Sequence, residues 1–178
     1  MTEITDTQSA WLSDADIESA RARLPIVYVD AIPVRVDDRG QVIAVGLLLR
    51  ARPDGSISRA VISGRVQYGE RIRDALLRHI EKDLGSMALP QLPTSPAPFT
   101  IAEYFPDPEV SGFHDPRQHA VSLVFVVPVV GDCAPSHNAL DLVWLTPQEV
   151  VSLEVRAEMT GGQDLLVRLA LAHAGQLP

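Results

Sequence analysis

Apolar residues recur along the chain at two different spacings, and the change between them predicts a fold of mixed helices and strands. Five extended segments are rich in β-branched residues: residues 26–36, 41–50, 57–67, 99–105 and 119–130. That composition over these lengths is typical of β-strands. From Ile72 the period changes to four residues, through Leu76, Ile80 and Leu84. This period predicts an amphipathic helix that ends at Gly85.

Polar residues and prolines mark the ends of further elements. Ser13 is the predicted N-cap of a short helix over residues 13–23, and residues 37–40 (DDRG) have the composition of a hairpin turn between two strands. A short extended segment around Trp144 precedes residues 146–149 (TPQE), which have the pattern of an N-cap followed by the first turn of a helix. The chain closes with a leucine-rich amphipathic segment over residues 162–174, a further predicted helix.

Length and charge narrow the class of protein. The chain has 178 residues and a net charge of −8, which suits one compact α+β domain. We expect that domain over residues 26–178, with residues 1–25 as an N-terminal extension that holds the short helix. The acidic balance argues against nucleic acid as a partner, because a phosphate-backbone binder needs a basic surface.

Three further features concern the compartment in which the protein works. The longest apolar run, residues 121–130, has ten residues and is too short to span a bilayer, so no membrane partner is expected. The first ten residues are acidic and polar and lack a signal-peptide pattern. A single cysteine, Cys133, allows no internal disulfide. These features predict a cytoplasmic location.

Residues 64–86 (GRVQYGERIRDALLRHIEKDLGS) resemble the Nudix box, the pattern G-x5-E-x7-R-E-U-x-E-E-x-G-U in which U is a bulky apolar residue. Gly64, Glu70, Arg78, Ile80 and Gly85 match the pattern, and Asp83 is a shortened stand-in for a glutamate. The departures are His79 and Lys82, each in place of a glutamate, and Ser86 in place of the last apolar residue. Most of the motif's acidic side chains are therefore missing.

The resemblance extends over about residues 26–175. Residues 115–125 are similar to a loop and strand of Nudix proteins that handle ADP-ribose-like compounds, and residues 142–150 are similar to a late strand and helix start of that superfamily. The leading residues 11–37 resemble the start of an uncharacterised Nudix-like family. The resemblance implies a Nudix fold, an α/β/α sandwich with a central mixed sheet.

The chemistry of the motif depends on charge at three helix positions. Hydrolysis of a diphosphate by water is assisted by Mg²⁺ or Mn²⁺ held by carboxylate oxygens. Carboxylates at positions i, i+3 and i+4 of a helix converge on one patch. Here those positions hold His79, Lys82 and Asp83, whose summed charge is near zero or positive. Glu70 and Asp83 are the remaining candidate metal ligands.

Two classes of function follow. In the first, the chain binds a small anionic nucleotide-like ligand, such as ADP-ribose or a nucleotide sugar, without efficient hydrolysis, and Lys82 and His79 replace the metal as charge partners. In the second, it is a weak or divergent pyrophosphohydrolase that uses Mg or Mn, a carboxylate outside the motif such as Glu103, and His79 or His119 as general base. A protein-interaction scaffold is a further alternative.

The sequence thus nominates a set of site residues. For catalysis they are Glu70, His79 and Asp83, with Glu70 and Asp83 also as metal ligands, and for ligand binding Lys82, Arg65, Arg78, Arg117, His119 and Glu103. The resemblance implies that Arg78 pairs with Glu70 to hold the loop between them. Simpler explanations stay open: Lys82 as a solvated helix residue, His79 as a half-buried one and Glu103 as an exposed strand residue. The alternating segment 26–36 suits strand pairing across a homodimer.

Overall fold

The structure is a computed structural model that describes residues 12–135 and 139–178. Its central element is a mixed seven-stranded sheet in which five strands follow the order β3-β2-β1-β6-β5, while β4 pairs with β1 and β7 pairs with β2. The strands are β1 (Ile26–Val36), β2 (Val42–Ala51), β3 (Ile57–Ala60), β4 (Ile62–Arg65), β5 (Thr100–Tyr104), β6 (Ala120–Pro128) and β7 (Asp141–Leu145).

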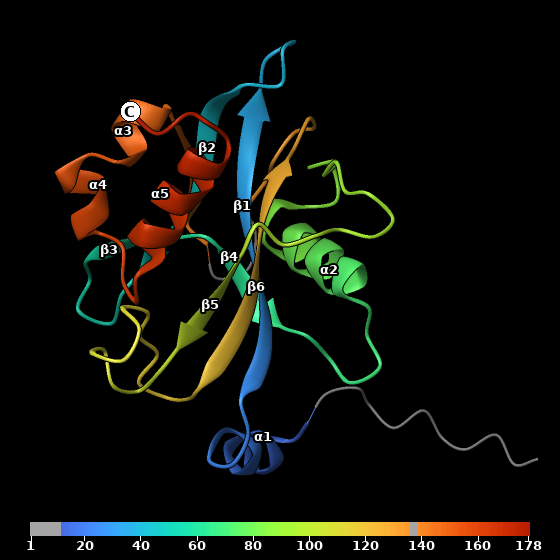
Figure 1. Ribbon diagram of the computed structural model, residues 1–178, viewed down its shortest axis with the longest axis vertical. Helices are drawn as coiled ribbons and strands as arrows, with labels where there is room; N and C mark the ends of the chain where they lie inside the picture. Colours follow the sequence, from blue (N-terminus) through green and yellow to red (C-terminus); the bar gives the residue numbers. More distant parts are fainter. Residues whose placement is uncertain (1–11, 136–138) are drawn as a thin grey trace, which may run out of the picture.

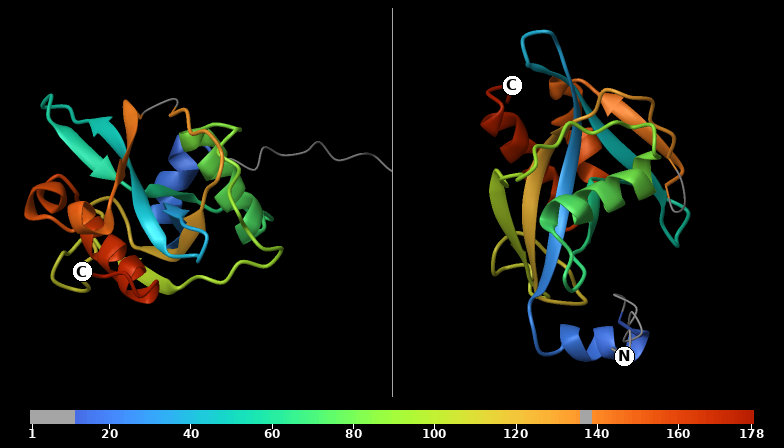
Figure 2. Two further views of the ribbon diagram at one scale, coloured as in Figure 1. Left: turned by 90° about the horizontal axis from the view of Figure 1, so that it is seen from above. Right: turned by 90° about the vertical axis from the view of Figure 1, so that its right-hand side faces the viewer.

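Helices cover both faces of this sheet (Figure 1). One face packs on α2 (Ile72–Leu84), and the other packs on α3 (Pro147–Val150), α4 (Leu153–Ala157) and α5 (Gln163–His173). A further helix, α1 (Asp14–Arg21), lies beyond the end of the sheet where β1 begins (Figure 2). The expected α/β/α sandwich with a central mixed sheet is therefore confirmed.

Alternation along β1 divides the core in two. Val29 and Ala31 contribute to the cluster beneath α2, whereas Ile32 and Val34 contribute to the cluster beneath α3, α4 and α5. Successive side chains of a strand point to opposite faces, so one strand supplies both cores. Asp30 is the exception to this apolar pattern, because it is buried on the α5 side of the sheet.

The predicted helix ends are confirmed where capping residues mark them. The Ser13 side chain accepts a hydrogen bond from the backbone N–H of Asp16 at 3.2 Å, and Thr146 forms a reciprocal capping box with Glu149. In α2 the four-residue stripe is buried as predicted, with Leu76 and Leu84 fully inaccessible to solvent. The helix ends at Gly85, whose φ of 84° suits glycine.

Two expectations need correction. Residues 57–67 form two strands rather than one, because the chain crosses at buried Val61 from the edge of β2 to the edge of β1. The proposed pairing of residues 26–36 across a dimer is also wrong. β1 already pairs with β2 and β4 along one edge and with β6 along the other, so it offers no free edge to a second copy.

The first helix is joined to the domain by specific contacts. Ile17 is buried, and the guanidinium of Arg21 donates a hydrogen bond to the Gln118 side chain at 2.9 Å. The division of the chain at residue 25 stays a prediction, and residues 1–11 of the expected extension lie outside the described residues. In the described part of the chain, no helix has the length and apolar character needed to cross a membrane.

Candidate ligand-binding site

The loop between β4 and α2 is held by an ion pair at its base. Arg78 donates to both carboxylate oxygens of Glu70 at 2.7 Å, and Glu70 also accepts the backbone N–H of Gln67 at 2.9 Å. The hydrogen bonds from Arg78 are the main reason that the pKa of Glu70 is lowered. The pairing implied by the Nudix resemblance is therefore confirmed, and it occupies the Glu70 carboxylate.

His79 is buried against the same loop. Its Nε2 lies 3.0 Å from the carbonyl oxygen of Arg65, which also accepts a hydrogen bond from Arg78 at 3.0 Å. A Cβ atom added to Gly64 would lie only 1.8 Å from the imidazole, so the ring fills space that glycine leaves open. Burial lowers the pKa of His79 and favours its neutral form, although the contact with Arg65 opposes the shift. His79 therefore adds little positive charge to the surface.

The two remaining motif positions differ in exposure. Asp83 is buried and lies 3.4 Å from the guanidinium of Arg50, which reaches it from β2. Lys82 is exposed and lines a broad depression on the outer surface of α2 with Arg78 and His79. The sequence pattern brings His79, Lys82 and Asp83 to one side of α2, but it gave no indication that Arg50 joins them.

The residues at this motif do not fit a Mg²⁺ or Mn²⁺ centre of the kind that the resemblance implies. Glu70 and Asp83 each face a guanidinium, and Lys82 brings an ammonium group to a position where the motif has a carboxylate. No group of three His, Cys, Asp or Glu side chains placed to share a metal ion exists among residues 12–135 and 139–178. Each of the two remaining motif acids therefore already has a cationic partner, and the ammonium group of Lys82 would repel a divalent cation.

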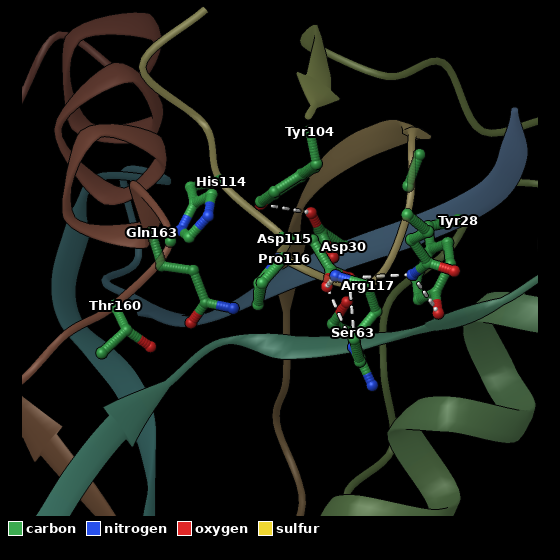
Figure 3. A pocket seen from close by; sticks show the side chains of 13 residues that line it. Tyr28, Asp30, Ser63, Tyr104, His114, Asp115, Pro116, Arg117, Thr160 and Gln163 are labelled. Atoms are coloured by element: carbon green, nitrogen blue, oxygen red, sulfur yellow. Dashed lines mark hydrogen bonds and ion pairs between the residues drawn. The ribbon is translucent and has the colours of Figure 1, made fainter. Parts of the chain in front are cut away.

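A cavity of about 430 Å³ lies on the opposite face of the sheet, beside α5. Its volume is in the range that accommodates small ligands. Figure 3 shows its floor, where Asp30, Ser63 and Tyr104 come from three strands, and its side walls, formed by the loops that precede β6 and α5. Ser63 and Gly64 are neighbours in β4, yet Ser63 lines the cavity and Gly64 faces His79.

A hydrogen-bonded network fixes the loop before β6. Arg117 donates from Nε and Nη2 to the two carboxylate oxygens of Asp115, each at 2.9 Å, and buried Gln118 donates to Asp115 at 2.8 Å and to the Tyr28 hydroxyl at 2.9 Å. Burial acts to raise the pKa of Asp115, but the hydrogen bonds from Arg117 and Gln118 more than offset it and leave that pKa lowered. Arg117 therefore stands at the cavity rim as part of an ion pair.

The floor of the cavity contains a buried carboxyl group. Asp30 is 1% exposed and accepts a hydrogen bond from the Tyr104 hydroxyl at 3.2 Å. Burial raises the pKa of Asp30, against the opposing effect of the hydrogen bond from Tyr104 and of the nearby Ser63 and Ser122 hydroxyls, while burial and the nearby Asp30 raise the pKa of Tyr104. Both groups consequently favour their protonated forms more than they would in water.

The other nominated residues lie in varied settings. His119 stacks on Phe105 with ring centroids 4.4 Å apart, and its Nε2 is buried without a hydrogen-bond partner within the part of the chain that the structure describes. Glu103 is exposed on β5 and lines neither the cavity nor the depression on α2. Arg65 follows Gly64 at the end of β4, and its Cα pairs with that of Tyr28 at the cavity.

Several residues that line the cavity are not among those that the sequence nominates. Asp30 carried a usable signal, since it is a charged residue inside the apolar run of β1. Tyr104 and Gln163 carried none, because only the pairing of β5 with β6 and the packing of α5 bring them to the cavity.

The fold defined above is that of the Nudix hydrolases. A Nudix hydrolase from Nitrosomonas europaea has a TM-score of 0.59 at 17% identity, over 85% of this chain and 90% of that one. An Ap4A hydrolase from C. elegans has a TM-score of 0.60 at 12% identity, over 84% of this chain and 98% of that one. At these identities the likeness concerns the fold alone.

A further solved structure is much more similar to this chain in sequence. It is described as that of possible asymmetric diadenosine tetraphosphate (Ap(4)A) hydrolases from Jonesia denitrificans, and it has 63% identity and a TM-score of 0.86 over 88% of this chain and 98% of that one. The chain belongs to the family described as "Domain of unknown function (DUF4916)", which matches residues 7–176. A comparison with curated proteins gives no match.

Proposed function

We propose that this chain is a Nudix-fold protein that binds a nucleoside-diphosphate-type ligand, ADP-ribose-like in its chemistry, without efficient metal-dependent hydrolysis. The observation that carries the proposal is the state of the two remaining motif acids. Glu70 is held by Arg78 and Asp83 by Arg50, while Lys82 stands exposed beside them. Carboxylates committed to guanidinium groups are poor ligands for a hard divalent cation.

In this proposal the anionic part of the ligand lies along the end of β4 and the surface of α2. Lys82 supplies a point charge for a phosphate group, and Arg65 at the end of β4 and Arg117 at the cavity rim are further candidates. In this proposal His79 contacts the loop between β4 and α2 rather than the anion, because its Nε2 already lies within hydrogen-bonding distance of the Arg65 carbonyl oxygen. The cavity beside α5 then takes the uncharged part of the ligand.

A second candidate function is hydrolysis of a dinucleoside polyphosphate. The observation that favours it is the 63% identity to a structure described as that of possible Ap4A hydrolases. If the chain is such an enzyme, Mg or Mn would be its cofactor, and Glu70 and Asp83 would have to exchange their guanidinium partners for the ion. Glu103 and His119 would then be candidates for the missing carboxylate and the general base.

Calorimetry and turnover assays separate the two functions. The native protein is incubated with ADP-ribose, Ap4A and nucleoside triphosphates in 5 mM Mg²⁺ or Mn²⁺, and binding is measured in parallel with EDTA. We expect binding in EDTA and turnover at background. Robust metal-dependent hydrolysis that Asp83→Ala abolishes would overturn the proposal in favour of the enzyme. If no nucleotide binds or shifts the melting temperature, the remaining alternative is a scaffold for protein contacts. A cytoplasmic location and the absence of nucleic-acid and membrane partners stay predictions.

A further inference from the structure

Tyr104 of β5 and Gln163 of α5 give the cavity beside α5 a defined hydrogen-bonding polarity. Both side chains are half-buried and line the cavity. Tyr104 uses its hydroxyl hydrogen, and Gln163 uses its amide oxygen, in a hydrogen bond within the protein, so the hydrogen-bonding role left to each side chain is fixed. Figure 3 shows Tyr104 at the top and Gln163 at the left among the residues that line the cavity.

Towards a ligand, the Tyr104 hydroxyl can act only as a hydrogen-bond acceptor. A phenol has one hydrogen to donate, and Tyr104 donates it to the Asp30 carboxyl at 3.2 Å. Burial raises the pKa of Tyr104, so this hydrogen is retained at neutral pH. The lone pairs of the hydroxyl oxygen are then available to a ligand. Asp30, which is 1% exposed, acts as a positioning residue that orients the hydroxyl.

The Gln163 side chain is left as a donor. Its Oε1 accepts the backbone N–H of Val61 at 3.1 Å. A backbone N–H can donate to the amide oxygen but not to the amide nitrogen, so this contact fixes which end of the carboxamide faces the sheet. The NH₂ group lies at the other end, on the side facing the centre of the cavity (Figure 3).

We propose that the Tyr104 oxygen and the Gln163 NH₂ group form an acceptor and donor pair that recognises the polar edge of an uncharged heteroaromatic ring, such as a nucleobase. Such an edge carries a donor beside an acceptor, which complements the pair. A phosphate does not suit this floor, because the carboxyl groups of Asp30 and Asp115 line it and offer acceptors rather than donors. The inference rests on the proposed function for the nucleotide class of ligand, and it adds the chemical class of the uncharged part and the residues that select it.

Nucleosides test the inference because they lack phosphate. Binding of adenosine and of purine riboside, which lacks the exocyclic donor, is measured by calorimetry or ligand-observed NMR for the native chain, Tyr104→Phe and Gln163→Glu. The glutamate keeps an oxygen for Val61 but replaces the donor with an acceptor. We expect the native chain to prefer adenosine about three- to ten-fold, the worth of one neutral hydrogen bond, and Tyr104→Phe to lose most of that preference. Gln163→Glu should instead weaken the binding of both nucleosides, because both carry the ring nitrogen that accepts from the Gln163 NH₂ group.

Matched control variants are available outside the cavity. Tyr68 is 98% exposed and Gln148 is exposed at the start of α3, so Tyr68→Phe and Gln148→Glu repeat the same chemical changes away from the site. Both controls should keep the native preference. A purely structural role for Tyr104 would weaken both nucleosides equally, whereas recognition changes their ratio.

Two results would overturn the inference: an unchanged preference in Tyr104→Phe together with unchanged affinities in Gln163→Glu, or no nucleoside binding by the native chain. A parallel titration with pyrophosphate keeps this outcome apart from failure of the proposed function. Pyrophosphate binding that depends on Lys82, together with absent nucleoside binding, refutes the cavity assignment alone. Nucleoside binding that follows the predicted pattern, with no affinity for pyrophosphate, refutes the anion site and retains the role of Tyr104 and Gln163.

Discussion

The partner of each acidic side chain, more than its place in the motif, decides its chemistry in this chain. Glu70 has a lowered pKa because Arg78 donates to it, whereas burial raises the pKa of Asp30 despite the hydrogen bond from Tyr104. The first group is an anion stabilised within an ion pair, and the second is a buried carboxyl group that accepts a hydrogen bond from a neutral hydroxyl. Sequence patterns identify the residue types, but only the folded chain determines these partners.

Replacement of Asp30 by asparagine should make the protein more stable at neutral pH. The folded pKa of Asp30 is raised above its unfolded value, so its contribution to stability is fully present below pH 3.8 and is lost as pH rises toward the folded pKa. Each unit of the upward shift costs about 1.4 kcal/mol once the pH exceeds the folded value. Asp30→Asn avoids this cost and keeps an oxygen for Tyr104.

Urea unfolding at several pH values measures this effect. The gain in the free energy of unfolding of Asp30→Asn over the native chain should be largest near pH 8 and should shrink as the pH approaches 4. The change Glu81→Gln at an exposed position of α2 serves as the control for loss of a surface carboxylate. A variant that is less stable than the native chain at pH 8 would contradict the prediction.

Replacement of Lys82 by alanine should weaken anion binding without unfolding α2. A charge-assisted contact is worth about 1.5–3 kcal/mol, so the Kd for pyrophosphate in metal-free buffer should rise about ten- to a hundred-fold. Arg39→Ala, in the exposed turn between β1 and β2, removes the same charge elsewhere and should leave the Kd within about two-fold. Equal affinities for Lys82→Ala and the native chain would mean that Lys82 is an ordinary solvated residue.

At the scale of elements, the sequence predicted those helices whose position depends on nearby residues, namely on apolar spacing and on capping side chains. The stripe of Ile72, Leu76, Ile80 and Leu84 predicted α2, because each of these side chains must leave water and a period of four places them on one face. Ser13 and Thr146 predicted helix starts because their oxygens cap backbone N–H groups. The break at Val61 had no local signal, since it depends on which neighbouring strand offers an open edge.

The candidate site was predictable only in part for the same reason. The spacing of the motif placed His79, Lys82 and Asp83 together, and the resemblance implied the Glu70–Arg78 pair. Arg50 reaches Asp83 from a strand 33 positions earlier in the chain, a contact set by the packing of α2 on β2. The cavity likewise joins β1, β4, β5 and the start of α5, and no spacing in the sequence encodes that meeting.

The contact between β4 and α2 at Gly64 provides a prediction at this scale. Gly64→Ala would place a Cβ 1.8 Å from the His79 ring, so the ring must move and give up its contact with Arg65. We expect a loss of about 1–3 kcal/mol in the free energy of unfolding, the usual cost of overpacking a core. A double-mutant cycle with His79→Ala in urea measures the coupling.

In that cycle the second substitution should relieve the first. With the imidazole removed, the added methyl group partly fills the space that the ring leaves, so the double variant should be more stable than the sum of the single changes by about 1 kcal/mol or more. Additive effects would show that Gly64 and His79 are not coupled and that the glycine serves the backbone instead.

At the scale of the whole molecule, the sheet separates two regions of different chemistry. Ser63 and Gly64 of β4 are adjacent, but one faces the cavity beside α5 and the other faces α2. A ligand that passes over the end of β4 could place an uncharged ring on one side and an anionic group on the other. The arrangement requires the loop between β4 and α2 to be rigid, and Arg78, His79 and Glu70 make it rigid through protein contacts alone.

Because Glu70 and Asp83 already have guanidinium partners, we predict that Mg²⁺ has little effect on the stability of the native chain. A site with a Kd of about 1 mM or weaker adds at most about 0.4 kcal/mol at 1 mM Mg²⁺, which corresponds to about 1 °C in Tm for a protein of this size.

The acid-restored variant, with His79→Glu, Lys82→Glu and Asp83→Glu together, replaces the cationic position with carboxylates at i, i+3 and i+4. Its Tm should rise by several degrees when 1 mM Mg²⁺ replaces EDTA, while its affinity for pyrophosphate in EDTA falls below that of the native chain. The single variant Lys82→Gln, which removes the cation but adds no carboxylate, controls for charge loss and should gain little from Mg²⁺. If Mg²⁺ raises the Tm of the native chain by as many degrees as that of the acid-restored variant, Glu70 and Asp83 already hold the ion. The hydrolase would then be the better account of this protein.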